Sequence, residues 1–270
     1  MSDIEIARSI TKSNIKEVAS KISLENNLIN YGKYMAKIDF DKVSSQKSGK
    51  LILVTSINPT IYGEGKTTTA IGLVDALNKL DKNAVAILRE PALGPVFGTK
   101  GGATGGGCAK VIPSDDINLH FTGDMSAICT ANNLLCAIID NHIFQGNELK
   151  IKNVVLPRTI DINDRALRNI TINSSYNRED HFILTVASEL MACVCLANDF
   201  KELKEMVANM IVAYNDTGKP IYTKDLQAVE AVCILLKETI KPNAVQTLEH
   251  NLAIIHGGPF ANIAHGTATV

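Results

Sequence analysis

A loop of glycine and lysine between an apolar run and a helical stretch is the feature that most constrains the fold. Residues 63–68 read Gly-Glu-Gly-Lys-Thr-Thr and follow the β-rich run Leu-Ile-Leu-Val-Thr at residues 51–55. An apolar run without alternation is typical of a strand buried on both faces of a parallel sheet. Residues 67–80 then show helical periodicity, and residues 84–88 form a second apolar run. This order predicts a P-loop-type, doubly wound, mostly parallel α/β sheet flanked by helices.

The loop also predicts a nucleotide phosphate site. It is a variant of the pattern G-x-x-x-x-G-K-[ST], with Thr60 in place of the first glycine. Lys66 can reach the β- and γ-phosphates of ATP, and the Thr67 hydroxyl can join the Mg²⁺ shell. An ordinary turn with a threonine-capped helix is the alternative. The predicted ATP-binding residues are Thr60, Gly63, Glu64, Gly65, Lys66, Thr67 and Thr68, with Thr67 as the metal contact.

A second candidate site follows the second apolar run, at Arg89 and Glu90. Ligands of open α/β sheets bind beyond the carboxyl ends of the strands, so Arg89 should lie where a second anion or a transferring phosphoryl group would sit. A surface salt bridge of Arg89 is equally consistent with its position. The glycine-rich stretch 91–107 then allows backbone N–H groups to approach a ligand closely, and Cys108 ends it. Gly105, Gly106 and Cys108 are therefore candidate pocket residues.

Charge and hydropathy exclude two classes of partner. The formal net charge is −1, whereas a nucleic-acid binder needs a dense basic face. No run of residues is long and apolar enough for a bilayer, and the N-terminus carries acid where a secretory signal carries Lys or Arg. We expect no nucleic acid, no membrane and a cytoplasmic location. The six cysteines match no zinc spacing and are expected to be reduced core residues.

The remaining pattern predicts one nucleotide-binding domain over residues 1–270, with a helical N-terminal arm over residues 1–49 and the P-loop core from residue 50 onward. Further strands are expected at residues 154–160 and 252–256. Helices are expected at residues 126–139, 164–170, 185–196, 200–210 and 228–240.

Several runs in chain order resemble the formate–tetrahydrofolate ligase family. The loop Gly-Glu-Gly-Lys-Thr-Thr-Thr and the run Arg-Glu-Pro with Leu-Gly-Pro-Val-Phe-Gly carry the resemblance in the first third. The longest later matches are Asp-Ile-Asn-Leu-His-Phe-Thr-Gly-Asp at residues 116–124 and His-Gly-Gly-Pro-Phe-Ala-Asn-Ile-Ala-His-Gly at residues 256–266. Shorter matches lie at residues 140–142, 163–165, 185–189 and 241–243.

The resemblance implies an ATP-dependent C–N ligase of one-carbon metabolism. Formate would attack the γ-phosphate to give formyl phosphate, and tetrahydrofolate would take the formyl group, giving 10-formyltetrahydrofolate, ADP and phosphate. Lys66 and Arg89 would be catalytic, with Lys66 and Thr67 binding ATP and Mg²⁺ and Arg89 holding formyl phosphate. Members also respond to monovalent cations and are typically homotetramers, so we expect a homo-oligomer.

The sequence also departs from that family. Cys108 stands where the family usually has Tyr, and further departures lie at Ser126, Phe144 and Thr267. The family continues well beyond residue 270, and its later half supplies the aromatic platform for the folate, whereas this chain has no Trp. A truncated nucleotide-binding remnant without ligase activity is therefore the alternative. A P-loop switch ATPase of the partitioning type is a third reading, disfavoured because no lysine stands early in the loop.

Overall fold

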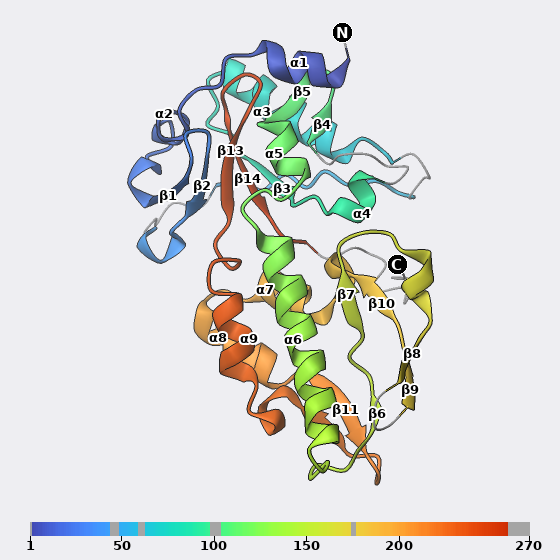
Figure 1. Ribbon diagram of the computed structural model, residues 1–270. Helices are drawn as coiled ribbons and strands as arrows, with labels where there is room; N and C mark the ends of the chain where they lie inside the picture. Colours follow the sequence, from blue (N-terminus) through green and yellow to red (C-terminus); the bar gives the residue numbers. More distant parts are fainter. Residues whose placement is uncertain (1, 44–48, 59–62, 98–103, 174–176, 259–270) are drawn as a thin grey trace. The chain divides into compact units, whose positions relative to one another are not determined.

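The computed structural model describes residues 2–43, 49–58, 63–97, 104–173 and 177–258 (Figure 1). The chain forms two compact units. One comprises residues 1–122 and 241–256, and the other comprises residues 123–240 and 257–270. The sequence predicted one nucleotide-binding domain over residues 1–270, and the glycine and lysine loop lies in the first of these units.

The first unit is built around a seven-stranded sheet of order β1-β2-β13-β14-β3, with β5 also paired to β13 and β4 paired to β5. Its helices and strands are α1 (Asp3–Ser9), α2 (Ile15–Ser20), η1 (Glu25–Asn27), β1 (Leu28–Tyr31), β2 (Met35–Ile38), η2 (Phe40–Lys42), α3 (Lys66–Lys79), β3 (Ala86–Arg89), α4 (Leu93–Val96), β4 (Gly105–Gly106), β5 (Ala109–Ile112), α5 (Ser114–Asn118), β13 (Asn243–Thr247) and β14 (Leu252–His256).

The α/β class is confirmed, but the prediction of a mostly parallel, doubly wound sheet is wrong for the described residues. In this sheet only β14 and β3 run parallel, and the other pairs are antiparallel. Short connections explain part of this pattern, because strands joined by a few residues can pair only antiparallel. Three hairpins arise in this way: β1–β2, β4–β5 and β13–β14.

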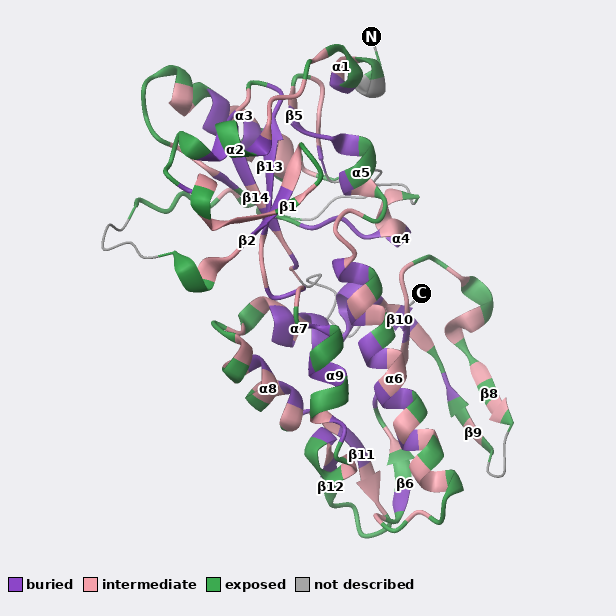
Figure 2. Ribbon diagram, turned by 60° about the vertical axis from the view of Figure 1, so that its left-hand side comes forward, coloured by how far each residue is buried: buried purple, intermediate pink, exposed green. Residues whose placement is uncertain are grey.

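The strand predicted at residues 51–55 does not form. Leu51 is 88% exposed and Leu53 is 80% exposed, and the segment belongs to no sheet. The apolar run at residues 51–55 predicted a strand in the buried interior of the sheet. That place is taken by β13, which is buried along its whole length (Figure 2). The sequence Asn-Ala-Val-Gln-Thr of β13 has too few large apolar residues to be recognised as a core strand.

The helical arm predicted for residues 1–49 is helical only in its first part. After α2, the strands β1 and β2 pair as an antiparallel hairpin, with Tyr31 opposite Met35. Gly32 takes a positive φ of 75° in the turn, and β2 continues the main sheet by pairing with β13. The hairpin forms because it completes a core in which Ile15 and Val18 of α2 pack with Ile38.

Within its described residues the second unit contains the long helix α6, six shorter elements of α-helix or 3₁₀-helix, and three small sheets. Its helices and strands are α6 (Asp124–Phe144), β6 (Ile151–Val154), β7 (Arg158–Ile160), η3 (Arg165–Arg168), β8 (Ile170–Asn173), β9 (Asn177–Asp180), β10 (Phe182–Leu184), η4 (Thr185–Ala187), α7 (Glu189–Leu196), α8 (Phe200–Ala208), β11 (Ile211–Asn215), β12 (Pro220–Tyr222), η5 (Thr223–Leu226) and α9 (Val229–Leu235).

The strand predicted at residues 154–160 is divided into β6 and β7, which belong to different sheets. The division falls at Pro157, which has no N–H group to donate to a ladder. The helix predicted at residues 164–170 is only the short η3, followed by β8. The helices predicted at residues 126–139 and 200–210 are confirmed apart from their ends. The helix predicted at residues 185–196 is divided at Ser188 into η4 and α7, and the one predicted at residues 228–240 is the shorter α9, which ends at Leu235.

The expectation of core cysteines holds for three of the six, because Cys129 and Cys195 are only half-buried. All six are free, and Cys136, Cys193 and Cys233 are buried. Burial raises the pKa of Cys136 and of Cys193 to about 12, and that of Cys233 to about 11, so these thiols stay protonated at neutral pH. Cys108 is exposed. Within the described part of the chain, no helix is long and apolar enough to cross a bilayer.

Candidate functional site

The glycine and lysine loop ends at the start of α3. Gly65 is the residue before the helix, and its φ of +70° is one that glycine adopts without strain. No side chain caps this end of α3 among the described residues. The first N–H groups of a helix have no partner within the helix, so they remain available to an anion. Thr67 and Thr68 stand in this first turn and are half-buried, whereas Thr60 lies outside the described residues.

The Lys66 ammonium is held at the loop itself. It donates a hydrogen bond to the Ser56 hydroxyl at 3.2 Å, and it contacts the Glu64 carboxylate. The Lys66 side chain is 45% exposed and that of Glu64 is 14% exposed. The lysine therefore presents its charge to solvent beside the helix terminus, and a bound phosphate would compete with Glu64 for it.

The core fixes α3 firmly behind this loop. Ile71 and Val74 of α3 are buried against Ala86 and Leu88 of β3 and against Ile255 of β14. An ideal helix of this length extends about 20 Å, and only six residues connect it to β3. Since α3 and β3 pack together and are joined by so short a connection, the N-terminal end of α3 and the carboxyl end of β3 lie on the same side of the sheet.

Arg89 is the last residue of β3, on the same side of the sheet as the start of α3. β3 and β14 run parallel, with Arg89 beside His256, and the Glu90 N–H donates to the His256 carbonyl at 3.2 Å. Arg89 is exposed, whereas the Glu90 side chain is only 2% exposed. Desolvation lowers the pKa of Arg89, but a guanidinium remains charged at neutral pH after such a change. The one parallel strand pair of the sheet thus carries a cation at its carboxyl end.

Gly105, Gly106 and Cys108 belong to a tight hairpin. β4 pairs with β5, so that Gly106 lies opposite Ala109 and residues 107–108 form the turn. Gly105 has a φ of +89°, and a Cβ atom on it would lie 2.2 Å from the Ala109 carbonyl oxygen. Cys108 lines a hollow of about 260 Å³ with residues of the middle and end of α3, including Gly72, Asp75 and Lys79. Neither Lys66 nor Arg89 lines this hollow.

We therefore expect Gly105→Ala to destabilise the first unit by about 2–3 kcal/mol, because the new Cβ meets backbone in a conformation that L residues avoid. Gly107→Ala is the matched control. Gly107 also has a positive φ, of 56°, but a Cβ there meets nothing within 4 Å, so its cost should be about 1 kcal/mol. Chemical denaturation of both variants measures the difference. Equal losses would show that strain in φ, and not the close contact, makes glycine necessary at position 105.

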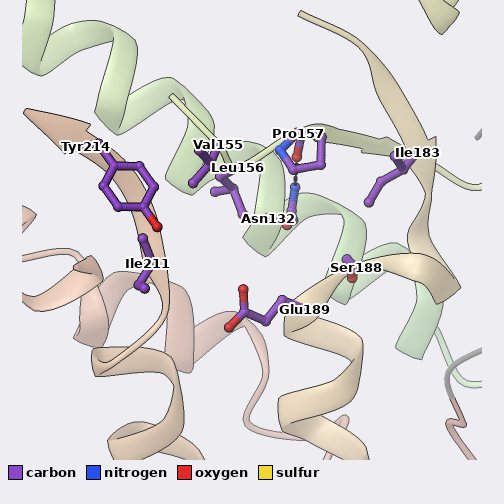
Figure 3. A pocket seen from close by; sticks show the side chains of 9 residues that line it. All are labelled: Asn132, Val155, Leu156, Pro157, Ile183, Ser188, Glu189, Ile211 and Tyr214. Carbon is purple, nitrogen blue, oxygen red and sulfur yellow. Dashed lines mark hydrogen bonds between the residues drawn. The ribbon is translucent and has the colours of Figure 1, made fainter. Parts of the chain in front are cut away.

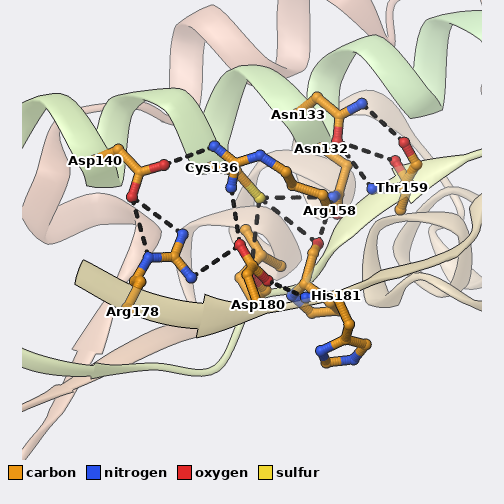
Figure 4. A network of polar contacts seen from close by, with 11 residues as sticks. Asn132, Asn133, Cys136, Asp140, Arg158, Thr159, Arg178, Asp180 and His181 are labelled. Carbon is orange, nitrogen blue, oxygen red and sulfur yellow. Dashed lines mark hydrogen bonds and ion pairs between the residues drawn. The ribbon is translucent and has the colours of Figure 1, made fainter. Parts of the chain in front are cut away.

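The sequence did not predict a four-membered ion network in the second unit (Figure 4). Arg158 of β7 binds Asp180 at 3.0 Å and Asp140 of α6 at 2.6 Å. Arg178 of β9 binds Asp140 at 3.0 Å and Asp180 at 2.8 Å. Arg178 and Asp180 share one face of β9 because they are two residues apart, and this spacing is the only local signal.

Three further titratable residues have structural partners. The His142 ring accepts a hydrogen bond from the Leu149 N–H at 3.1 Å, near the end of α6. Asp164 caps η3, and Asp115 pairs with Arg8 at 2.8 Å. Among the described residues, no group of three or more His, Cys, Asp or Glu side chains could hold a metal ion.

A comparison with protein families gives one finding. The family model described as formate–tetrahydrofolate ligase matches residues 1–270. That match covers all the elements described above in both units.

Proposed function

The chain belongs to the formate–tetrahydrofolate ligase family, and we propose that it joins formate to tetrahydrofolate with ATP through a formyl phosphate intermediate. The family implies ATP-dependent ligation of these substrates. The observation that carries the proposal is the match over residues 1–270, which includes both the loop before α3 and the end of β3.

The first step would be the transfer of the γ-phosphoryl group of ATP to formate. A carboxylate oxygen of formate attacks the γ-phosphorus, the bond to the β–γ bridging oxygen breaks, and ADP leaves. Formate is a weak nucleophile, so the rate depends on alignment and on neutralising charge on the phosphoryl oxygens. The free N–H groups at the start of α3 and the Lys66 ammonium supply positive charge for this purpose.

The second step would be the capture of the formyl group. The N10 amine of tetrahydrofolate attacks the formyl carbon, phosphate leaves, and the amine loses its proton. Arg89 is the cation at the strand end, and a guanidinium matches the oxygens of a phosphoryl group in a bidentate manner. We propose that Arg89 holds formyl phosphate. The sequence also predicts Glu90, Gly105, Gly106 and Cys108 as pocket residues, but Cys108 lines the separate hollow beside α3, so its part in this pocket rests on the sequence alone.

The described residues fit a Mg²⁺ ion that is held mainly by substrate. Mg²⁺ usually keeps several waters and binds substrate phosphates rather than a cage of protein carboxylates. Thr67, at the second position of α3, is the residue that would contact it, and no carboxylate cluster competes for the ion within the described chain. Such an ion would neutralise charge on the phosphate oxygens. The proposal also includes a monovalent cation, and the only support for that cation is the resemblance to the family.

The experiment is product formation by the purified 270-residue chain with ATP, Mg²⁺, formate and tetrahydrofolate. We expect 10-formyltetrahydrofolate and ADP only when every substrate is present. Nucleotide binding without formate-dependent ADP formation would instead favour the alternative of a nucleotide-binding protein without ligase activity. Absence of ATP binding would contradict both.

Arg89→Ala gives a separate test of the second site. We expect about a 100-fold loss of formate-dependent turnover, because the anion loses its charged partner, with ATP affinity changed less than about twofold. Arg8→Ala, which removes an exposed arginine paired with Asp115, is the matched control and should leave turnover unchanged. An equal fall in ATP affinity in Arg89→Ala would show that Arg89 serves the nucleotide and not the formyl phosphate.

A further inference from the structure

A cavity of about 280 Å³ lies within the second unit (Figure 3). Its walls come from α6, the segment between β6 and β7, β10, the start of α7 and β11. Much of the wall is aliphatic, through residues such as Leu156, Ile183 and Ile211. The polar groups that face it include Asn132, Glu189 and Tyr214. None of the residues that line it has a part in the proposed ligase chemistry, so the cavity needs an explanation of its own.

Glu189 is the one ionisable carboxylate among the lining residues. It is the first residue of α7, and its carboxylate is turned toward the space between Tyr214 and Asn132 (Figure 3). Within the described residues it forms no hydrogen bond and no ion pair, although three salt-bridged Glu residues occur elsewhere on the surface of both units. Glu189 is an exposed residue, and desolvation by its neighbours raises the pKa of its carboxyl. A cation in the cavity would remove that penalty.

Asn132 provides a second acceptor. Its side chain is only 1% exposed, and its Nδ2 donates to the Pro157 carbonyl at 2.9 Å. Within the described residues the Asn132 Oδ1 accepts no hydrogen bond, and Figure 3 shows it directed to the same space as Glu189. An amide oxygen that faces the cavity can accept a hydrogen bond, so this atom also suits a ligand with N–H groups.

The third polar side chain is compatible with the same ligand. The Tyr214 hydroxyl lies across the cavity from Glu189 and can accept or donate one hydrogen bond. Ser188, in contrast, is already engaged, because its hydroxyl donates to the Thr185 carbonyl at 2.7 Å and accepts from the Met191 N–H at 3.1 Å. The accessible polar atoms are therefore mostly acceptors, with one negative charge among them.

We propose that this cavity binds a small organic cation: a protonated amine or amidine that carries a short apolar group. The ammonium or amidinium N–H groups would donate to the Glu189 carboxylate and to Asn132 Oδ1, and the apolar group would contact Ile183 and Ile211. The volume lies just below the usual range for drug-sized ligands, which limits the ligand to a few carbon atoms or a single ring. The proposal does not rest on the ligase reaction.

The test is thermal unfolding of the 270-residue chain with benzamidine, with neutral benzamide and with KCl, each at about 10 mM. If benzamidine binds with a Kd near 1 mM, it should raise the Tm by about 2–4 °C. Benzamide lacks the charge and should have no effect, and KCl separates an organic cation from a simple monovalent ion. An equal shift with benzamide or KCl, or no shift with benzamidine, would overturn the proposal.

Variants assign the effect to the cavity. Glu189→Gln keeps the size of the side chain but removes its charge, and it should abolish the benzamidine shift. Glu205→Gln, on the exposed side of α8, is the matched control and should retain the full shift. If Glu189→Gln folds poorly, Val155→Phe is used instead. Val155 lines the cavity and is 41% exposed, so a larger side chain there would fill the cavity without changing Glu189. A benzamidine shift that survives in the folded variant would place the binding elsewhere.

Discussion

Lys66→Ala should lower ATP-dependent turnover about 1,000-fold or more and weaken ATP binding about 10-fold or more. Lys66 is the cation at the start of α3, and its charge would face the phosphates at every stage of phosphoryl transfer. A loss of this size corresponds to about 4 kcal/mol of transition-state stabilisation. Turnover and the ATP Kd are to be measured separately, so that the binding effect is visible even where turnover is low.

The control lies at the other end of the same helix. Lys79 is exposed and pairs with Glu249 at 2.9 Å, so Lys79→Ala removes the same side chain from α3 without touching the loop. It should leave turnover and ATP affinity within about twofold of the original values. Both variants should keep the Tm, because the contacts of both lysines lie at the surface. Lys66→Ala that retains a tenth of the turnover would exclude Lys66 from the phosphate site.

The part of this site that the sequence predicted is the part encoded by neighbouring residues. The helix after Gly65, the strand ending at Arg89 and the strand β14 were predicted because each is a continuous run with its own periodicity or turn residues. Local sequence also determines that Lys66 follows a glycine with positive φ. These features need no knowledge of the rest of the chain.

The strand pairing could not be predicted in the same way. The apolar run at residues 51–55 has stronger β propensity than β13, yet β13 occupies the buried interior of the sheet. What decides between them is long-range: β13 pairs with β2, β5 and β14, and Thr247 and Asn251 both donate to the buried Asp75 of α3, at 2.6 Å and 2.8 Å. A strand with polar side chains can lie in the core because hydrogen-bond partners satisfy its polar groups.

The ion network shows the same dependence on distant residues. Its four members come from α6, β7 and β9, and they lie between residues 140 and 180 of the sequence. Asp140 was noticed only as part of a run that resembles the ligase family, and nothing local to it indicates two arginine partners. The cavity beside Glu189 is similar, because its walls come from segments between residues 132 and 214.

Arg158→Leu should destabilise the second unit by about 3–5 kcal/mol, which is the largest stability effect we expect in the chain. The Asp180 side chain is only 4% exposed and the Asp140 side chain is 20% exposed, so both carboxylates depend on the arginines for compensation. Removal of Arg158 leaves two negative charges with one positive charge in a poorly solvated place. Urea unfolding measures the loss, and hydrogen exchange of the α6 amides assigns it to this unit.

The size of this destabilisation depends on how deeply the charged side chains are buried and not on the number of ion pairs. A matched ion pair in the same unit tests that reasoning. Lys204 and Glu230 lie 2.7 Å apart, but the Glu230 side chain is 78% exposed, so Lys204→Ala should cost less than about 1 kcal/mol. The double variant Arg158→Leu with Asp140→Leu should be less destabilised than the sum of the two single variants, because the second change removes a carboxylate that the first one stranded. Two results would contradict this reasoning: a loss for Arg158→Leu no larger than that for Lys204→Ala, or single losses that are additive. Either result would mean that water screens these four charges as it does on the surface. Apolar packing would then be what attaches β9 to α6.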